Sequence, residues 1–412
     1  MSVRTIHGAV LATASLFASA QTPALELSVS PEFNLGSRAT DNVLFSANDV
    51  QDALGFDTGG RLNLLAETPT LRSNVTPDFN FRRFAVGDNL DADEYGIRSQ
   101  HQWKANDRLT AALQADYYQD STLSTELTDA GRQNNVSDRE TVNLQPSLVL
   151  ALDALTQLNA SYAYTDITTD ATANAGLVDY SYQMATVGAS RTVSDDWQVF
   201  ATGFISWFDV PSQRSFNTTY GVQTGATWAV DEATRISTSV GYLTSDIDYV
   251  DLVPVLVFDP APRILLLTFD RQASTDGPIA SISVERQFEH LRLSGKYARQ
   301  VSPTLRGAQS LEDAMDVRLD YDWSPEIALF AYGQYAMRSA QADVNQAASE
   351  DLNRDQFNAS GGMAWRATRL TTIRAEYRYA TSESNLAQSV ANVHSLFVTV
   401  NYRFDPFFIG FW

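Results

Sequence analysis

The strongest constraint on the fold is a strict two-residue alternation between polar and apolar side chains. In "TTIRAEYRYA" (Thr371 to Ala380), the charged residues Arg374, Glu376 and Arg378 alternate with apolar or aromatic residues. Side chains two positions apart share one face of a β-strand, so this segment predicts a strand with one charged and one apolar face. If the apolar face meets lipid, the charged face meets water. The reverse would place each arginine in hydrocarbon at about 2–4 kcal/mol near the bilayer midplane.

The same alternation recurs at intervals of about 20 residues, a spacing typical of hairpins in transmembrane barrels. Clear examples are "LTAALQADYY" (Leu109 to Tyr118), "EDAMDVRLDYDW" (Glu312 to Trp323) and "SLFVTVNYRF" (Ser395 to Phe404). No helical periodicity separates these segments, and no run of about 18 apolar residues could span a bilayer as a helix. Aromatic residues make up 11% of the chain although its hydrophobicity is modest. We therefore predict an all-β, antiparallel up-and-down transmembrane β-barrel.

The connections between the predicted strands alternate between short and long. The short ones are "KANDR" (Lys104 to Arg108), "LDALT" (Leu152 to Thr156), "VSDD" (Val193 to Asp196), "VDEAT" (Val230 to Thr234), "FEH" (Phe288 to His290), "SPE" (Ser324 to Glu326) and "RATR" (Arg366 to Arg369). Longer polar connections include Asp120 to Ser137, Asp209 to Asn217 and Ala340 to Asp355. Short periplasmic turns and long external loops are typical of outer-membrane barrels.

Counting hairpins predicts about eighteen strands, with both termini periplasmic; sixteen is the alternative, because that arrangement requires an even number. Fourteen strands have clear patterns. The first four are weaker and are predicted at Ala24 to Leu35, Arg61 to Glu67, Leu71 to Phe84 and Tyr95 to Trp103. Residues 21–412 are then one barrel domain.

The first twenty residues have a different character. Arg4 is followed by the apolar stretch Gly8 to Phe17 and by the small residues Ala18, Ser19 and Ala20. This order predicts a secretory signal peptide at residues 1–20, cleaved after Ala20; the alternative is an apolar first helix of a soluble domain. The chain contains no cysteine, which suits an oxidising compartment. The expected location is the outer membrane of a Gram-negative bacterium, with outer-membrane lipid, lipopolysaccharide and the barrel insertion machinery as partners.

Tryptophans mark one end of the predicted barrel. Five of the seven lie beside short turns: Trp103, Trp197, Trp228, Trp323 and Trp365. Indole rings favour the interface between a bilayer and water. We predict that these five form a periplasmic aromatic girdle.

The face assigned to the interior carries nearly balanced charge. Its predicted basic residues are Arg72, Arg82, Arg98, Lys104, Arg292, Lys296, Arg318, Arg374, Arg378 and Arg403, and its predicted acidic residues are Glu26, Asp78, Asp116, Glu285, Asp316, Asp320, Asp322 and Glu376. This balance predicts an aqueous pore with weak ion selectivity. The net charge of −20 argues against nucleic acid as a partner, because phosphate binding needs basic patches.

Two further segments have specific predictions. "YVDLVPVLVFDPAPRILLLTFD" (Tyr249 to Asp270) is apolar and lies on the long-loop side. It is read mainly as two extended strand tips; a fold into the pore and an external partner surface are the alternatives. At the C-terminus, Val398, Val400, Tyr402 and Phe404 resemble the assembly signal of outer-membrane barrels, and Asp405 to Trp412 is expected to be a periplasmic or interfacial tail.

The middle of the chain resembles a known family. The tandem hairpins in Leu177 to Pro211 and Ser215 to Asp246, and "ATDNVLFS" (Ala39 to Ser46), are similar to the outer-membrane β-barrel family of exopolysaccharide gene clusters, of the β-barrel porin type. The resemblance implies an outer-membrane channel linked to polysaccharide secretion. The ending "DPFFIGFW" (Asp405 to Trp412) departs from that pattern.

No catalytic, cofactor or metal site is predicted. After signal removal, the histidines His101, His290 and His394 do not converge in the predicted register. The acidic stretch "DNLDADE" (Asp88 to Glu94) lacks the ligand spacing of a calcium loop and is read as a solvated loop. Two functions remain: a channel for sugars or polysaccharide, or a closed barrel with a structural role in a secretion complex. Aromatic interior residues such as Phe200, Phe204, Phe330 and Tyr332 fit either sugar stacking or a plugged interior.

Overall fold

The computed structural model describes residues 25–48, 50–85, 90–122, 137–170, 178–258, 262–303, 309–340, 354–384 and 389–411. Its strands are β1 (Leu25–Thr40), β2 (Ala53–Glu67), β3 (Leu71–Phe84), β4 (Ala92–Lys104), β5 (Leu109–Ser121), β6 (Asp138–Ala151), β7 (Thr156–Thr169), β8 (Tyr180–Thr192), β9 (Trp197–Val210), β10 (Ser215–Ala229), β11 (Thr234–Phe258), β12 (Pro262–Gln287), β13 (Leu291–Pro303), β14 (Gln309–Asp322), β15 (Ile327–Ala340), β16 (Arg354–Arg366), β17 (Thr371–Ser384), β18 (Ser389–Arg403) and β19 (Phe407–Phe411). A short 3₁₀ turn, η2 (Pro211–Gln213), joins β9 to β10. No helix of the described residues is long and apolar enough to cross a membrane.

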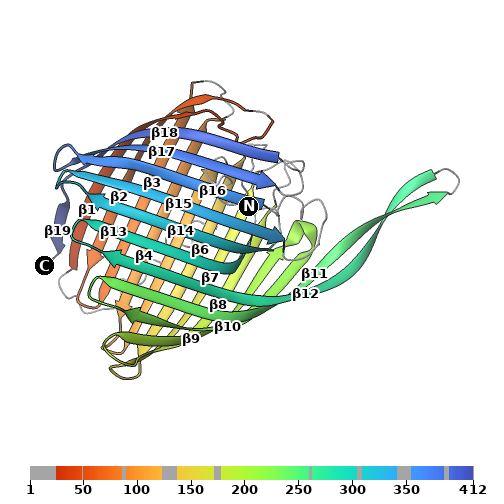
Figure 1. The fold of residues 1–412 in the computed structure, drawn as a ribbon, viewed down its shortest axis with the longest axis horizontal. Helices are drawn as coiled ribbons and strands as arrows, with labels where there is room; N and C mark the ends of the chain where they lie inside the picture. The colour runs from red at the N-terminus through yellow and green to blue at the C-terminus, as the bar shows by residue number, and fades with distance from the viewer. Residues whose placement is uncertain are drawn as a thin grey trace.

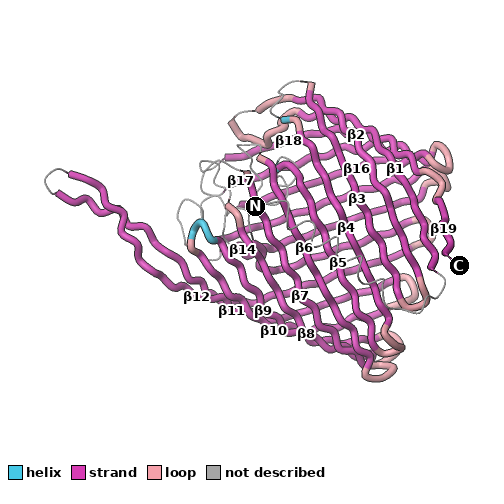
Figure 2. Tube along the Cα trace, turned by 180° about the vertical axis from the view of Figure 1, so that it is seen from behind, coloured by secondary structure: helices cyan, strands magenta, loops and turns pink. Residues whose placement is uncertain are grey.

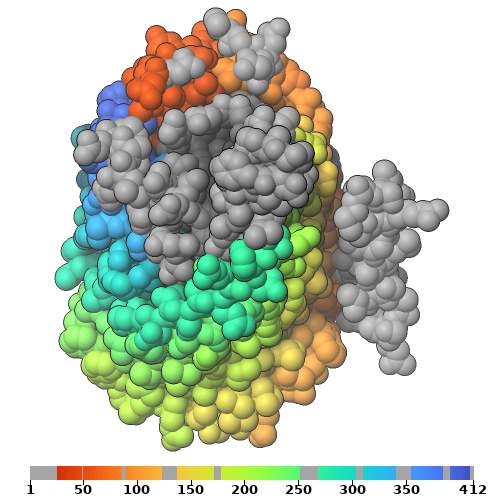
Figure 3. Space-filling view, turned by 90° about the vertical axis from the view of Figure 1, so that its right-hand side faces the viewer, coloured from red at the N-terminus to blue at the C-terminus, as the bar shows by residue number. Residues whose placement is uncertain are grey.

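The strands β1 to β18 form one closed antiparallel barrel (Figures 1 and 2). Each strand pairs with the next in sequence, and β18 pairs with β1 from Glu32↔Arg403 to Thr40↔Ser395. Figure 3 looks onto the long-loop end, where the described atoms form an oval rim. The prediction of eighteen antiparallel strands in a closed barrel is therefore confirmed, and sixteen is wrong.

The four weak strands of the N-terminal part exist, and three of them are longer than predicted. β1 continues five residues beyond Leu35, β2 begins eight residues before Arg61, and β4 begins three residues before Tyr95. The β3 bounds agree with the prediction. Both β1 and β2 carry glycines, polar residues and arginines at their long-loop ends, which breaks the apolar alternation used to locate them.

The short turns lie at one end of the barrel, and most of them are stabilised by a hydrogen bond between a side chain and the backbone of the turn. In the β6–β7 turn the Asp153 carboxylate accepts hydrogen bonds from the backbone N–H groups of Leu155 and Thr156. In the β10–β11 turn Asp231 accepts from Ala233 N–H. These backbone bonds favour the charged carboxylate and lower the pKa of both groups. In other short turns a side-chain oxygen likewise accepts from the backbone N–H group three residues on. The accepting residues are Thr68, Asn106, Ser324 and Thr368. Side chains of these types stabilise tight turns by bonding the backbone two or three residues on.

The segment from Tyr249 to Asp270 belongs to a long two-stranded hairpin. β11 and β12 have 25 and 26 residues, against 13 to 16 for the other barrel strands. Their pairing continues to Phe258↔Pro262, and the hairpin projects away from the barrel (Figure 1). The prediction of two extended strand tips is confirmed, and a fold into the pore is wrong.

The C-terminal segment also differs from expectation. Residues Phe407 to Phe411 are not a tail: they form β19, which pairs with the start of β1 from Leu25↔Phe411 to Val29↔Phe407. Three residues, 404–406, stand opposite two of β1, 30 and 31, so β18 and β19 are separated by a one-residue bulge. Because of this bulge, Leu25 to Val29 of β1 are paired with β19 although the β18 pairing ends at Glu32.

Candidate functional site

The two faces of the barrel wall differ in chemistry. The outer face carries exposed apolar side chains, with Val187, Val222 and Val240 each more than 60% exposed. The five predicted girdle tryptophans lie at the short-turn end of their strands: Trp103, Trp197, Trp228, Trp323 and Trp365. Trp197 and Trp228 are register partners, and their rings stack at 5.4 Å. An apolar band bordered by aromatics is the surface that a bilayer requires.

The inner face carries the charged residues that the sequence assigns to a pore. All thirteen residues predicted to line a pore lie within strands, on the face opposite the apolar band: Arg72, Arg82, Arg98, Asp116, Arg292, Lys296, Asp316, Arg318, Asp320, Arg374, Glu376, Arg378 and Arg403. The register places several opposite charges side by side, as at Arg98↔Asp116 and Lys296↔Asp316. Basic and acidic side chains therefore alternate across neighbouring strands.

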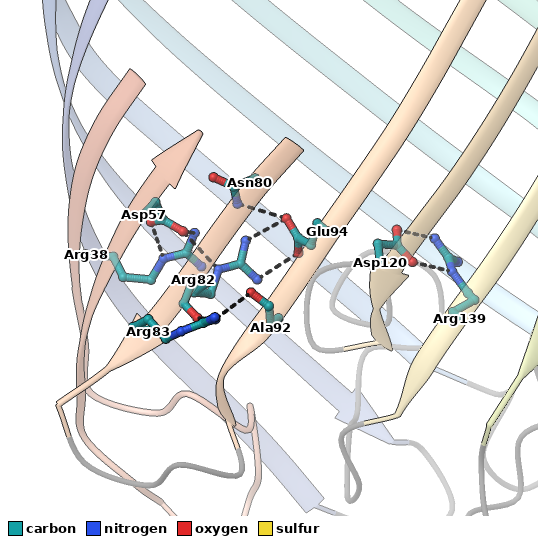
Figure 4. A network of polar contacts seen from close by, with 9 residues as sticks. All are labelled: Arg38, Asp57, Asn80, Arg82, Arg83, Ala92, Glu94, Asp120 and Arg139. Carbon is teal, nitrogen blue, oxygen red and sulfur yellow. Dashed lines mark hydrogen bonds and ion pairs between the residues drawn. The ribbon is translucent and has the colours of Figure 1, made fainter. Parts of the chain in front are cut away.

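At the long-loop end the inner charges are buried in ion pairs (Figure 4). The Arg82 side chain is 7% exposed and bridges Asp57 at 3.0 Å and Glu94 at 3.1 Å. Arg38 pairs with the same Asp57 at 3.1 Å, and Asn80 donates to Glu94. We call these five residues the rim network. It joins β1 to β4, and comparable pairs link Arg139 to Asp120 and Arg338 to Glu312.

Nearer the middle of the barrel the arginines are exposed and their carboxylate is buried. Glu376, 7% exposed, accepts from Arg374 at 2.9 Å and from Arg378 at 2.6 Å. The Arg374 guanidinium lies 3.9 Å from the Phe330 ring centroid, and that of Arg378 lies 4.5 Å from the ring of Phe397. These cation–π contacts hold both guanidinium groups against aromatic rings of the wall.

Several inner aromatic rings lie against glycines instead of standing out into the lumen. A Cβ on Gly221 would lie 2.6 Å from Phe204 Cζ, and one on Gly362 would lie 2.6 Å from Phe330 Cζ. Phe200 covers Gly225 in the same way. Each ring fills the space of a missing side chain on the adjacent strand. Phe200, Phe204 and Phe330 are thus packed into the wall, which neither plugs the interior nor offers an open stacking platform.

The loop between β1 and β2 folds against the inner wall. Phe45 is fully buried, with a left-handed φ of 46°, and packs on Ala391 and Val393 of β18. Asn42 Nδ2 donates to the carbonyls of Ser46 and Asn392, both at 2.8 Å. We call residues 41–48 the latch loop. It reduces the space at the long-loop end of the barrel.

Sequence reasoning missed both the latch loop and part of the rim network. Arg38, Asp57 and Glu94 lie in β1, β2 and β4 but outside the strands that the sequence predicts, so the alternation assigns them to neither face. The apolar run Val43 to Phe45 within a polar connection was the available signal for an inward loop.

One histidine is hydrogen-bonded to a serine, a contact that the sequence analysis does not address. Ser73 Oγ and His101 Nδ1 are 2.7 Å apart on the outer face. Catalysis requires a third group to orient the imidazole, but the buried His101 Nε2 has no partner among the described residues. Within that part of the chain, no cluster of histidine, aspartate or glutamate is arranged to hold a metal ion. In the acidic stretch, Asp91 and Asp93 pair with Arg83.

The chain is a closed β-barrel with an apolar outer band and a charged inner wall. No protein-family model and no curated protein matches the sequence. Solved structures similar in fold include OpdL of Pseudomonas aeruginosa (10% identity, TM-score 0.45, covering 94% of this chain and 99% of that one). OprD of the same organism has 10% identity, a TM-score of 0.46 and coverages of 92% and 95%. The ferric-catecholate import receptor Fiu of E. coli has 8% identity, a TM-score of 0.47 and coverages of 93% and 82%.

Proposed function

We propose that this chain is an outer-membrane channel that lets hydrophilic solutes, sugars among them, diffuse through its lumen. The observation that carries the proposal is the inner wall, which is polar and charged on every strand from β1 to β6 and from β13 to β18. Such groups need water unless they are paired and buried. Eighteen strands enclose more space than wall side chains alone can fill.

The proposed orientation places the short turns and both ends of the mature chain in the periplasm. The tryptophan positions and the predicted signal peptide support it; residues 1–24 lie outside the described part of the chain. In this arrangement Val398, Val400, Tyr402 and Phe404 are available to the insertion machinery, with Phe404 packed edge-on against Tyr402 at 4.8 Å.

The resemblance to barrels of exopolysaccharide gene clusters supports a more specific version of this proposal. In that version the solute is a polysaccharide chain that is being exported. The second candidate is a closed barrel with a structural role. The latch loop favours it, because Phe45 and Val43 occupy space inside the long-loop end.

Sugar permeation tests the channel directly. Liposomes containing the purified protein should swell in isosmotic glucose or sucrose, since the polar lumen admits both. Protein-free liposomes and a larger dextran provide the controls. If the liposomes remain sealed to glucose, the structural role replaces the channel.

The projecting hairpin should not affect permeation. Replacing Val253 to Leu267 by a two-residue Asn-Gly turn should leave the glucose rate unchanged, because the removed strands pair only with each other beyond the rim. The same swelling assay measures this. A faster rate in the shortened protein would mean that the hairpin obstructs the entrance.

A further inference from the structure

Charges on the inner wall are balanced in number but not in exposure. From the short-turn rim to the middle of the barrel, the described inner face carries twelve basic residues: Arg61, Arg72, Arg98, Lys104, Arg235, Arg292, Lys296, Arg318, Arg366, Arg374, Arg378 and Arg403. It carries ten acidic residues: Glu26, Glu32, Glu67, Asp78, Asp116, Glu285, Asp316, Asp320, Asp322 and Glu376. All twelve basic residues are exposed, whereas among the acids only Glu26, Glu285 and Asp322 are exposed as whole residues, and the Glu67 side chain is 43% exposed.

This difference in exposure arises from the geometry of the ion pairs between acidic and basic residues. Asp116 and Glu376 are each 7% exposed, while their partners Arg98 and Arg378 are 53% and 56% exposed. The carboxylate lies against the wall and the longer arginine extends over it. A solute in the lumen therefore meets guanidinium groups first, and Glu376 with its two arginines has a net charge of +1.

Hydrogen-bonding amides lie beside another of the exposed arginines, Arg72. A hollow of ≈ 480 Å³ on β3 to β6 is lined by Arg72, Asn74, Gln100, Gln102, Gln114 and Gln145 among others. Amides both donate to and accept from hydroxyl groups, and guanidinium binds carboxylate in a two-point geometry. The wall thus offers partners for both functional groups of an acidic sugar.

Resting on the proposed channel function, we propose that the lumen prefers anionic solutes, with carboxylate-bearing saccharides as the substrate class. The weak selectivity expected from nearly balanced numbers of charges is replaced by an anion preference that arises from which charges the lumen exposes. Because exposed charges are screened by salt, the preference is strongest at low ionic strength.

The first test is ion selectivity in planar bilayers under a KCl gradient. The wild-type protein should show a reversal potential whose sign is that of a pore more permeable to chloride than to potassium. Replacing Arg318, Arg374 and Arg378 by glutamine should lower the chloride-to-potassium permeability ratio by about threefold, from the loss of three nearby charges. The control variant replaces Arg83, Arg286 and Arg369, which lie on the outer face or in a turn, with the same change in total charge and no expected change in the ratio. A cation-preferring wild type, or an equal effect of both variants, overturns the proposal.

The second test compares glucuronate with glucose in protein-containing liposomes at low salt. Glucuronate should enter faster than glucose, and the advantage should disappear in the triple glutamine variant. If glucose enters and glucuronate is no faster, the anion preference is wrong and the channel stands. If neither enters, the channel itself is wrong.

Discussion

Replacing Arg82 by methionine is expected to lower the free energy of unfolding by about 3–5 kcal/mol, the effect of breaking a buried ion pair. Arg82 is shared by Asp57 and Glu94, and all three side chains are less than 20% exposed. Methionine preserves much of the volume but removes the guanidinium from between two carboxylates. Urea titration of the protein in liposomes, followed by tryptophan fluorescence, measures the loss.

The matched control is Arg318→Met. Arg318 also pairs with a carboxylate, Asp320 at 2.8 Å, but its side chain is 63% exposed. Exposed pairs contribute at most about 1 kcal/mol, so this variant should unfold near the wild-type urea concentration. Equal losses in both variants would show that burial does not distinguish the rim network from the middle of the barrel.

Replacing Gly225 by alanine is expected to destabilise the barrel by about 1–3 kcal/mol, as overpacking does elsewhere. The added Cβ would collide with the Phe200 ring and with the backbone carbonyl oxygen of Thr238. The backbone atom cannot move without disturbing the β10–β11 pairing. Heat-dependent mobility on gels and urea titration should both register the change.

Gly333→Ala is its control, because no atom lies within 4 Å of the Cβ that it would add. This variant should be as stable as the wild type or slightly more so, since alanine restricts the unfolded chain. A stable Gly225→Ala protein would mean that Phe200 has room to turn away, and that the aromatic packing over glycine is loose.

The fold was largely predictable because alternation and turn chemistry are local. A strand such as β17 displays its two faces within ten residues, and Asp153 or Asp231 marks a turn through backbone atoms two or three positions away. The boundaries of β1 and β2 were missed because their long-loop ends depend on ion pairs with β3 and β4 instead of on alternation. The sequence alone does not reveal a partner for Asp57, because Arg38 and Arg82 come beside it only when β1, β2 and β3 pair.

The inner wall was predictable in composition but not in exposure. Periodicity assigns Arg378 and Glu376 to one face and gives them equal weight. Only the packed structure shows that the shorter side chain is covered and the longer one is accessible. The latch loop was similarly hidden, since Phe45 finds its apolar contacts on β18, at the far end of the chain.

The seam between β1 and β18 has a geometric consequence for the whole barrel. In a closed sheet, strand number and shear together determine tilt and diameter, and the shear is set where the last strand meets the first. A slip of one residue there would displace β18 by about 3.4 Å. That movement would separate Asn42 from the carbonyl of Asn392, 350 residues away, and Phe45 from its contacts. The latch loop therefore adds side-chain contacts to the backbone pairing that holds this shear, and with it the cross-section that the barrel presents to a solute.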